Sequence, residues 1–266
     1  MDMAKVCYCA DDFAMNPEIS NAILLLIKTG ALHATSCMTQ AEYWPAAAQQ
    51  LKTISNNIQV GLHLNFTHAF SSVITTFPLP ILMLKAWGRQ LDSKLIQQSI
   101  EQQWNAFVAA MGKQPDFIDG HQHIHQFPMI REVLVSFLKQ HNFQGWIRNL
   151  QHPIPASHHK IKTHLLSTLG ASKLAVICQQ QKIRQNRYFA GIYNFESNNY
   201  AHLNQQWLEH AQDNLLIMCH PATQATDQQD PISTARVQEF YYLNSAQFHS
   251  DCQRYHITLS PMDILL

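Results

Sequence analysis

The sequence predicts an α/β protein in which parallel strands alternate with helices. Short apolar runs alternate with segments of helical apolar spacing over most of the 266 residues. Hydrophobic residues make up 46% of the chain, which is enough for a sizeable core. No repeat, low-complexity tract or linker rich in Pro, Gly and Ser marks a boundary. We therefore expect residues 1–266 to form a single domain built on a parallel sheet or barrel.

The elements expected in the first half of the chain follow from local signals. Lys5–Ala10 is an apolar run that ends at two aspartates, as is typical of a strand. Asn16 and Pro17 are an N-cap and a first-turn residue, so a helix should start there, continue to about Thr29 and end at Gly30. The other elements expected up to residue 120 are strands at His33–Met38, Ile58–Asn65 and Phe117–Gly120, and helices at about Pro45–Lys52 and Asp92–Met111.

Two later segments lack a clear pattern, and we expect substrate choice to depend on them. Phe70–Leu84 is rich in Phe, Pro and Leu and could be a lid or a substrate wall. His152–Asn199 has only weak strand signals, near Leu174–Cys178 and Tyr188–Ile192. The other elements expected after residue 120 are helices at Met129–His141, about Tyr200–Gln212 and Arg236–Asp251, and strands at Gln144–Arg148, Leu215–His220 and Ile257–Leu259.

Composition restricts the class of partner. The formal net charge is zero and no cluster of Lys and Arg is present, which argues against nucleic acid or an anionic membrane and favours a small neutral or polar substrate. The N-terminus lacks the pattern of a secretory signal, and the longest aliphatic run, Ile23–Ile27, is too short to cross a bilayer. The six cysteines lie mostly in apolar runs without zinc-ribbon spacing, as is typical of buried reduced thiols. We expect a cytoplasmic protein.

Ionisable residues follow four of the expected strands at the point where each strand ends. These residues are Asp11 and Asp12 after the first strand, His63 near the end of "IQVGLHLN", His121 after "DFIDG" and His220 after "LLIMC". The carboxyl ends of parallel strands meet at one face of a sheet or barrel, where active sites are built. A single aspartate could cap a turn, but four such strand ends together favour a site.

The residue types suit a metal-dependent hydrolase. One carboxylate and two imidazoles from separate strands can hold a divalent ion and leave positions open for water and substrate. Such an ion polarises a carbonyl oxygen and lowers the pKa of bound water. Asp11 and Asp12 are neighbours, so in a regular strand they would point to opposite faces. If the strand ends between them, one can bind the ion and the other can act as general base. Asp11 could instead form an Asx-turn at the strand exit.

The stretch "DFIDGHQHIHQFP" carries three histidines at alternate positions. In an extended segment His121, His123 and His125 would point the same way, roughly 6–7 Å apart. We expect only His121, the first residue after the strand, to bind a metal. His123 and His125 would then support the site or face the substrate, or they would be hydrogen-bonded loop histidines without a catalytic role.

Two strand-end residues, one of them already named, have further candidate roles. His220 precedes Pro221, which keeps its backbone extended, and its imidazole could donate a proton to a leaving amine or alkoxide. A neutral histidine bonded to a backbone carbonyl is the alternative. Arg148 ends the run "FQGWIR" and could orient Asp11 or hold substrate, or it could be an ordinary surface arginine.

The motifs "ADDFAMN", "VGLHLNFT", "DFIDGHQHIHQFP" and "LIMCHPA" follow one another in this order between Ala10 and Ala222. Together they resemble the YdjC-like carbohydrate deacetylases, a family that includes chitooligosaccharide deacetylases and deacetylases associated with hopanoid biosynthesis. The resemblance implies a distorted TIM-like (β/α) barrel that removes an acetyl group from an N-acetylated sugar with one divalent metal ion. Members often form homodimers, so a homodimer is a further implication.

The resemblance also implies roles for individual residues. Carried onto this sequence, the metal ligands are Asp12, His63 and His121. Asp11 then corresponds to the general base, and His220 to the acid that protonates the departing amine. Mg²⁺ is implied by the family, whereas two histidines and a carboxylate suit Zn²⁺ or another transition ion better.

One position departs from the family pattern, because this chain has Ala14 where the family usually has glycine after "DDF". Its methyl group could shift the turn behind the two aspartates.

The predicted reaction is metal-assisted amide hydrolysis that releases acetate from an oligosaccharide or glycolipid containing N-acetylglucosamine. Another metal-dependent hydrolase on a related barrel, an amidohydrolase or a phosphoesterase, is an alternative. Amidohydrolase-type barrels usually place a His-x-His pair on the first strand, where this chain has two aspartates. A non-catalytic sugar-binding relative is the remaining alternative, and the complete set of ligands together with Asp11 and His220 counts against it.

Overall fold

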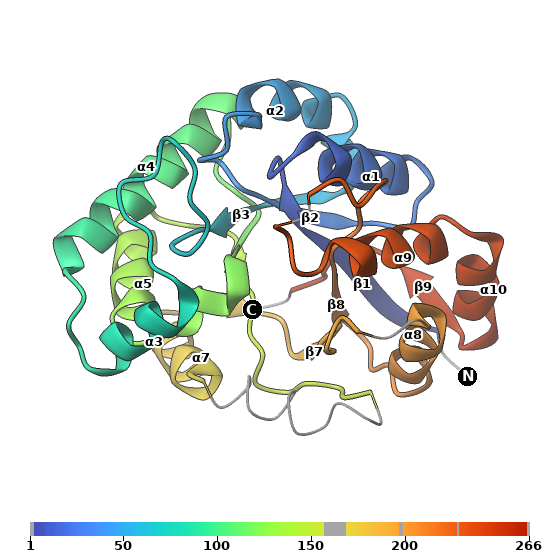
Figure 1. Cartoon of the computed structure of the whole chain (residues 1–266). Coiled ribbons are helices and arrows are strands. Elements are labelled where there is room, and N and C mark those ends of the chain that lie inside the picture. Colours follow the sequence, from blue (N-terminus) through green and yellow to red (C-terminus); the bar gives the residue numbers. More distant parts are fainter. Residues whose placement is uncertain (1–2, 157–168, 197–198, 228, 265–266) are drawn as a thin grey trace.

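The strands form one parallel sheet that curls into a partly open barrel, which confirms the predicted α/β class and distorted TIM-like barrel (Figure 1). The computed structural model describes residues 3–156, 169–196, 199–227 and 229–264. The strand order is β6-β5-β4-β3-β2-β1-β8-β7, and β9 also pairs with β1. The strands are β1 (Ala4–Phe13), β2 (Ala34–Cys37), β3 (Gln59–Leu64), β4 (Phe117–Gly120), β5 (Trp146–Ile147), β6 (Arg184–Gln185), β7 (Tyr188–Ala190), β8 (Leu215–Cys219) and β9 (Ile257–Leu259).

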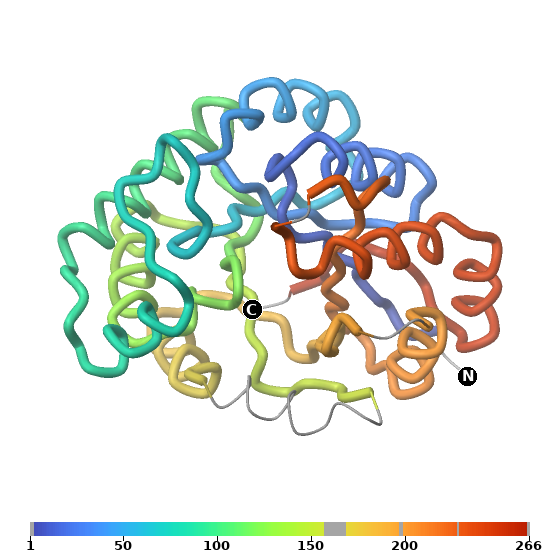
Figure 2. Tube along the Cα trace, viewed as in Figure 1, coloured from blue at the N-terminus to red at the C-terminus, as the bar shows by residue number. Residues whose placement is uncertain are grey.

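Helices surround the sheet, and the chain winds round so that the last helices return beside the first (Figure 2). The α-helices are α1 (Pro17–Lys28), α2 (Trp44–Lys52), α3 (Leu79–Trp87), α4 (Ser93–Met111), α5 (Ile130–Gln140), α7 (Ala171–Gln180), α8 (Tyr200–Glu209), α9 (Ser233–Leu243) and α10 (Ala246–Arg254), with 3₁₀ turns η1 (Ser55–Asn57) and η2 (His121–Gln126). Within the described residues, β6 and β7 end the strand order and are not paired with each other. The barrel therefore has a seam between them.

Helix α1 shows how local sequence signals determine an element. The Asn16 side chain accepts a hydrogen bond from the Ile19 N–H, and Pro17 occupies the first turn, where its missing N–H costs nothing. The helix ends before Gly30, whose φ of +76° lies in the left-handed region that glycine adopts without strain. The predicted start and end of this helix are confirmed.

Two predictions of secondary structure were wrong. Leu174–Cys178, expected as a weak strand, lies in α7, because Leu174 and Cys178 are four residues apart and form the buried side of a helix. The expected long helix Arg236–Asp251 is instead the pair α9 and α10. The chain breaks there because the Ser245 side chain caps α10 by accepting a hydrogen bond from the Phe248 N–H.

The histidine stretch is not extended, which corrects a third prediction. After β4 the chain turns into η2, and Gln122 and His123 both have left-handed φ values, 54° and 59°. The three histidines therefore do not share a face. Gly120 permits this turn, because a Cβ there would lie 3.0 Å from the Ile124 side chain and 3.1 Å from the His125 backbone nitrogen.

The two segments without a clear sequence pattern differ in the secondary structure that they form. Phe70–Leu84 contains the start of α3, which the sequence did not predict. In His152–Asn199, residues 157–168 and 197–198 lie outside the described residues, whereas Tyr188–Ala190 forms β7, as the weak strand signal there suggested.

Two predictions from composition can be compared with the structure. All six cysteines are buried and free, as expected. Among the described residues, no helix combines the length and apolar character that crossing a membrane requires.

The packing between β3 and β4 leaves no room for a side chain at Gly61. A Cβ there would lie 2.5 Å from the ring of Phe117, which is buried and stacked on Trp146. We expect Gly61→Ala to lower the free energy of unfolding by about 1–3 kcal/mol through overpacking, measured by denaturant titration. Phe117→Leu in the same chain should recover part of the loss, and strictly additive costs for the two substitutions would contradict this explanation.

Candidate active site

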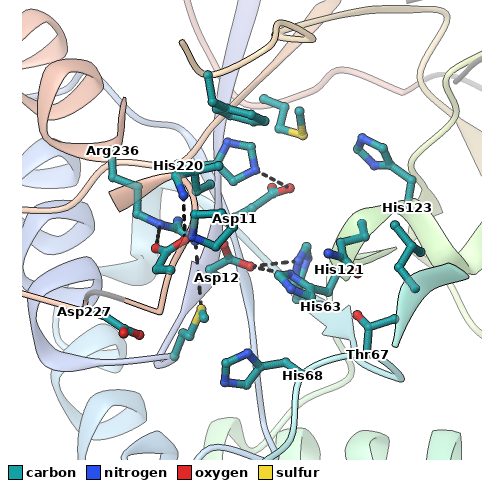
Figure 3. A pocket seen from close by; sticks show the side chains of 18 of the residues that line it. Asp11, Asp12, His63, Thr67, His68, His121, His123, His220, Asp227 and Arg236 are labelled. Atoms are coloured by element: carbon teal, nitrogen blue, oxygen red, sulfur yellow. Dashed lines mark hydrogen bonds and ion pairs between the residues drawn. The ribbon is translucent and has the colours of Figure 1, made fainter. Parts of the chain in front are cut away.

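A cavity of about 660 Å³ lies at the C-terminal ends of the strands. In Figure 3 the two aspartates of β1 lie in the middle, with His63 and His121 on one side and His220 and Arg236 on the other. The strand-end aspartates and histidines selected from the sequence all contribute to its lining, namely Asp11, Asp12, His63, His121 and His220. The convergence expected of parallel strands therefore brings all five together.

The three predicted ligands form a compact cluster. Asp12 Oδ1 lies 3.2 Å from His63 Nε2 and 3.0 Å from His121 Nδ1. The three ligand atoms lie within 4.8 Å of one another. One carboxylate oxygen and two imidazole nitrogens at this spacing suit a divalent cation, with room left on the cavity side for water or substrate.

An irregularity in β1 lets both neighbouring aspartates reach the cavity. The register of β1 against β2 shifts between Ala10 and Phe13, and Asp12 has a φ of 66°. This left-handed residue breaks the alternation that would otherwise send one aspartate to the opposite face. Ala14 is also left-handed, with a φ of 72°, a conformation that costs a residue other than glycine about 1–2 kcal/mol. The turn keeps this shape despite the methyl group of Ala14, and Ser20 Oγ accepts a hydrogen bond from the Ala14 N–H.

Arg236 fixes the orientation of Asp12 and was not predicted. It reaches in from α9, and its Nη2 donates to Asp12 Oδ2 at 2.7 Å while its Nε donates to Asp230 Oδ2 at 2.6 Å. The other oxygen of Asp12 is left facing the histidines. Burial alone would raise the pKa of Asp12, but Arg236 and His121 outweigh it and hold that pKa well below its usual range. Asp12 is therefore a carboxylate.

His63 is oriented by groups behind it. Its Nδ1 lies 2.7 Å from Asp119 Oδ1 and 3.0 Å from Ser36 Oγ, so its Nε2 points to Asp12. Burial would lower the pKa of His63, but Asp119 and Asp12 together raise it to about 10. In the protein alone, His63 thus carries a proton between two carboxylates, at a position where a cation can replace that proton.

Arg148 is not a surface arginine; it is fully buried behind the cavity. Its Nη1 and Nη2 each donate to one oxygen of Asp11 at 2.6 Å, and Nη2 also forms an ion pair with Asp119 Oδ2 at 2.7 Å. This bidentate contact is the geometry expected of a residue that orients Asp11. Arg148 is absent from the residues that line the cavity, so the alternative of direct substrate contact does not fit its position.

His220 lies on the other side of Asp11 from His63 and His121. Its Nε2 is 3.9 Å from Asp11 Oδ2, and the ring of Phe195 packs edge-on against it. Burial lowers the pKa of His220 to about 4 despite the nearby Asp11 and Asp12. At neutral pH the imidazole is therefore uncharged and able to accept a proton.

The other two histidines of the run have different positions. His123 lines the cavity and packs edge-on against Phe189. His125 is buried, does not line the cavity, and has its Nε2 3.0 Å from the Arg148 backbone oxygen. His123 is thus placed to face a substrate, and His125 is a hydrogen-bonded loop histidine that supports Arg148.

The two segments expected to influence substrate choice both reach the cavity. Leu79, at the start of α3, forms part of one wall, and the loop before it adds His68. Ile192 and Phe195 form part of the wall that follows β7. The sequence did not indicate His68, Asp227, Asp230 or Arg236 as lining residues. The sequence held one possible signal for Arg236. It lies three residues before Glu239 in an expected helix, so the two charged side chains share one face of that helix. In the structure both side chains are buried.

Comparison with known proteins gives consistent matches. The family described as YdjC-like protein matches residues 5–254. Chitooligosaccharide deacetylases of Yersinia pestis (strain Pestoides F) and Yersinia pseudotuberculosis serotype O:1b are each 26% identical over 227 residues, covering 80% of this chain and 79% of theirs. A crystal structure from Enterococcus faecalis V583, of a protein named for cellobiose-phosphate cleavage, superposes with a TM-score of 0.72 at 18% identity and covers 98% of both chains. That structure shows the same fold.

Replacing Arg148 by methionine should leave Asp11 and Asp119 as buried carboxylates without their cation. We expect Arg148→Met to lower the free energy of unfolding at pH 7 by about 3–5 kcal/mol, measured by denaturant titration. Lys113→Met is the control, because Lys113 pairs with Asp116 at the exposed surface, where such a pair contributes about 0–1 kcal/mol.

The loss in free energy of unfolding caused by Arg148→Met should become smaller as the pH falls. Burial would raise the pKa of Asp119, but Arg148 and His63 lower it to about 2. The wild-type protein therefore gains stability from this group above the usual carboxyl pKa and loses it as the pH falls toward 2. In the variant Asp119 should take up a proton more readily, which relieves its repulsion with Asp11. An equal cost for Arg148→Met and Lys113→Met at pH 7 would refute the role assigned to Arg148.

Proposed function

Because the chain belongs to the YdjC-like protein family, we propose that it is a carbohydrate deacetylase that hydrolyses the acetamide group of an N-acetylated sugar with one divalent metal ion. The observation that carries this proposal is the position of Asp11 and His220 beside the cluster of Asp12, His63 and His121 in one cavity. The relatives named chitooligosaccharide deacetylase support the same reaction class.

Asp12, His63 and His121 would hold the metal. A divalent ion bound there supplies Lewis acidity, which polarises the acetamide carbonyl and makes water a stronger nucleophile. The hydrogen bond that His63 Nδ1 donates to Asp119 keeps Nε2 available as a ligand. Two nitrogen donors favour Zn²⁺ or another transition ion, whereas the family resemblance favours Mg²⁺.

Asp11 is the proposed general base. Both its oxygens accept hydrogen bonds from Arg148, which fixes the plane of the carboxylate beside the metal cluster. It takes one proton from the attacking water as the carbon–oxygen bond forms. Arg148 stabilises the carboxylate by its charge and does not itself exchange protons.

His220 is the proposed carrier of that proton to the leaving group. The imidazole is uncharged at neutral pH, and its Nε2 lies 3.9 Å from Asp11 Oδ2. It accepts the proton from Asp11 and donates it to the sugar nitrogen as the carbon–nitrogen bond breaks. The products are acetic acid and the free amine, which at neutral pH separate as acetate and the ammonium form of the sugar, and both side chains return to their starting protonation states.

The cavity supports a carbohydrate substrate. Its volume of about 660 Å³ accommodates more than one sugar ring, and its walls combine apolar residues such as Leu79 and Ile192 with polar groups such as His123. Such walls pack against ring faces while a few donors and acceptors select hydroxyl groups. We propose an oligosaccharide or glycolipid that contains N-acetylglucosamine as the substrate class.

The function is tested by acetate release from N-acetylglucosamine, chitooligosaccharides and acetylated glycolipids, with metal added back to metal-stripped protein. We expect release from at least one substrate and its loss after metal removal. His63→Ala should lose metal and activity together, because it removes a ligand; His210→Ala, at an exposed histidine, is the control. Wild-type activity in metal-free His63→Ala would refute the scheme.

Asp11→Asn separates the general base from the metal ligands. The amide cannot accept the proton of water, so we expect the rate of acetate release to fall by about 100-fold or more while the metal content stays unchanged. Elemental analysis and single-turnover kinetics measure the two quantities. If the variant loses its metal, Asp11 is a ligand and the roles of the two aspartates must be exchanged.

A further inference from the structure

A buried carboxylate that has no role in the proposed mechanism lies directly behind His220. Glu239, on the inner side of α9, is fully buried. It accepts hydrogen bonds from the backbone N–H of His220 and from the Tyr193 hydroxyl, both at 2.5 Å. Its Oε1 also lies 4.0 Å from His220 Nδ1.

The ring nitrogen Nδ1 of His220 faces Glu239 Oε1, the oxygen that also accepts the hydrogen bond from Tyr193. His220 Nδ1 is buried and has no hydrogen-bond partner in the described part of the chain. Among the same residues, His220 is the only Lys, Arg or His side chain with a nitrogen within 4.0 Å of a Glu239 oxygen. At 4.0 Å the two groups are too far apart for a hydrogen bond, so the buried carboxylate acts on the imidazole through its charge, which favours an N–H on the nitrogen that faces it.

The contacts also fix which way the ring points. Glu239 binds the backbone N–H of His220 and faces Nδ1 of the same residue, so ring and backbone are oriented by one group. The edge-on contact with Phe195 restricts the ring further. With Nδ1 toward α9, Nε2 is directed to Asp11 and the cavity.

We propose that Glu239 is the positioning residue for His220. It keeps the proton of the neutral imidazole on Nδ1, which leaves the lone pair of Nε2 free to accept the proton from Asp11. When that proton arrives, the carboxylate stabilises the imidazolium by its opposite charge. The inference rests on the proposed function only in that His220 carries a proton there; the tautomer itself is a property of the protein without substrate.

The charge state of Glu239 decides the conditions of the test. Burial raises the pKa of Glu239 to about 7, against the opposing effects of the His220 N–H, Tyr193 and Arg236. The carboxylate therefore predominates at pH 8. The other titratable groups that act on it or respond to it are Asp11 on β1, Cys219 on β8 and Tyr200 on α8.

Glu239→Gln tests the inference by steady-state acetate release at pH 8. The amide keeps the size of the side chain and one acceptor for the His220 N–H, but it removes the charge facing Nδ1. We expect kcat to fall by at least about tenfold, with KM within about twofold and the metal content unchanged, because only the proton-transfer step is affected.

Asp251→Asn is the matched control. Asp251, on α10, is likewise a buried carboxylate that accepts a hydrogen bond from a tyrosine, Tyr242, at 2.9 Å, but it does not contact His220. It should lose stability without the fall in kcat. An unchanged kcat in Glu239→Gln, or an equal fall in both variants, would overturn the inference.

Nitrogen-15 NMR of the wild-type protein loaded with Zn²⁺ gives a readout that needs no substrate and leaves Glu239 unchanged. The His220 ring signals are assigned by their absence in His220→Asn. At pH 8 we expect Nδ1 to carry the proton and Nε2 to be unprotonated. A proton on Nε2 would overturn the inference even if acetate is released, whereas the expected tautomer in a protein that releases no acetate would refute the proposed function alone.

Discussion

The guanidinium of Arg148 lies where the strands of the barrel would otherwise gather negative charge. Asp11 and Asp119 come from β1 and β4, and both carboxylates are almost inaccessible to water. Arg148 contacts both, and Asp119 in turn orients His63, whose Nε2 faces the ligand cluster. Two charges of one sign at this depth would be unfavourable without such a cation. The proposed general base and one of the proposed metal ligands thus take their positions from the same buried arginine.

Backbone conformations that are unfavourable elsewhere are concentrated next to this network. Asp12 and Ala14 flank the end of β1 with left-handed φ values, and Gln122 and His123 do the same after β4. Such residues persist only where surrounding contacts hold them, and they occur often in functional sites. Here they redirect side chains: the first pair lets two successive aspartates reach one cavity, and the second folds the chain back after His121.

Much of the site was predictable because it depends on position in the fold. Residues at the ends of parallel strands converge regardless of loop conformation, so the alternation of strands and helices was enough to identify them. These residues are Asp11, Asp12, His63, His121 and His220. The arrangement of the histidine run could not, because nothing in its composition signalled two left-handed residues in succession. Supporting residues such as Arg236 were missed for a different reason. It meets Asp12 across 224 positions of chain, and only the packing of a helix on the barrel brings them together.

Helix α9 contributes to both halves of the proposed chemistry. Arg236 binds Asp12, one of the proposed ligands, and Glu239, one helical turn later, lies behind His220. Both side chains leave the same face of one rigid element, so a small tilt of α9 moves them together. The affinity for a metal and the basicity of the imidazole are then correlated traits. Mutations that repack this helix should therefore change metal affinity and imidazole basicity together. Adapting the site to a different metal would require a compensating change near the imidazole.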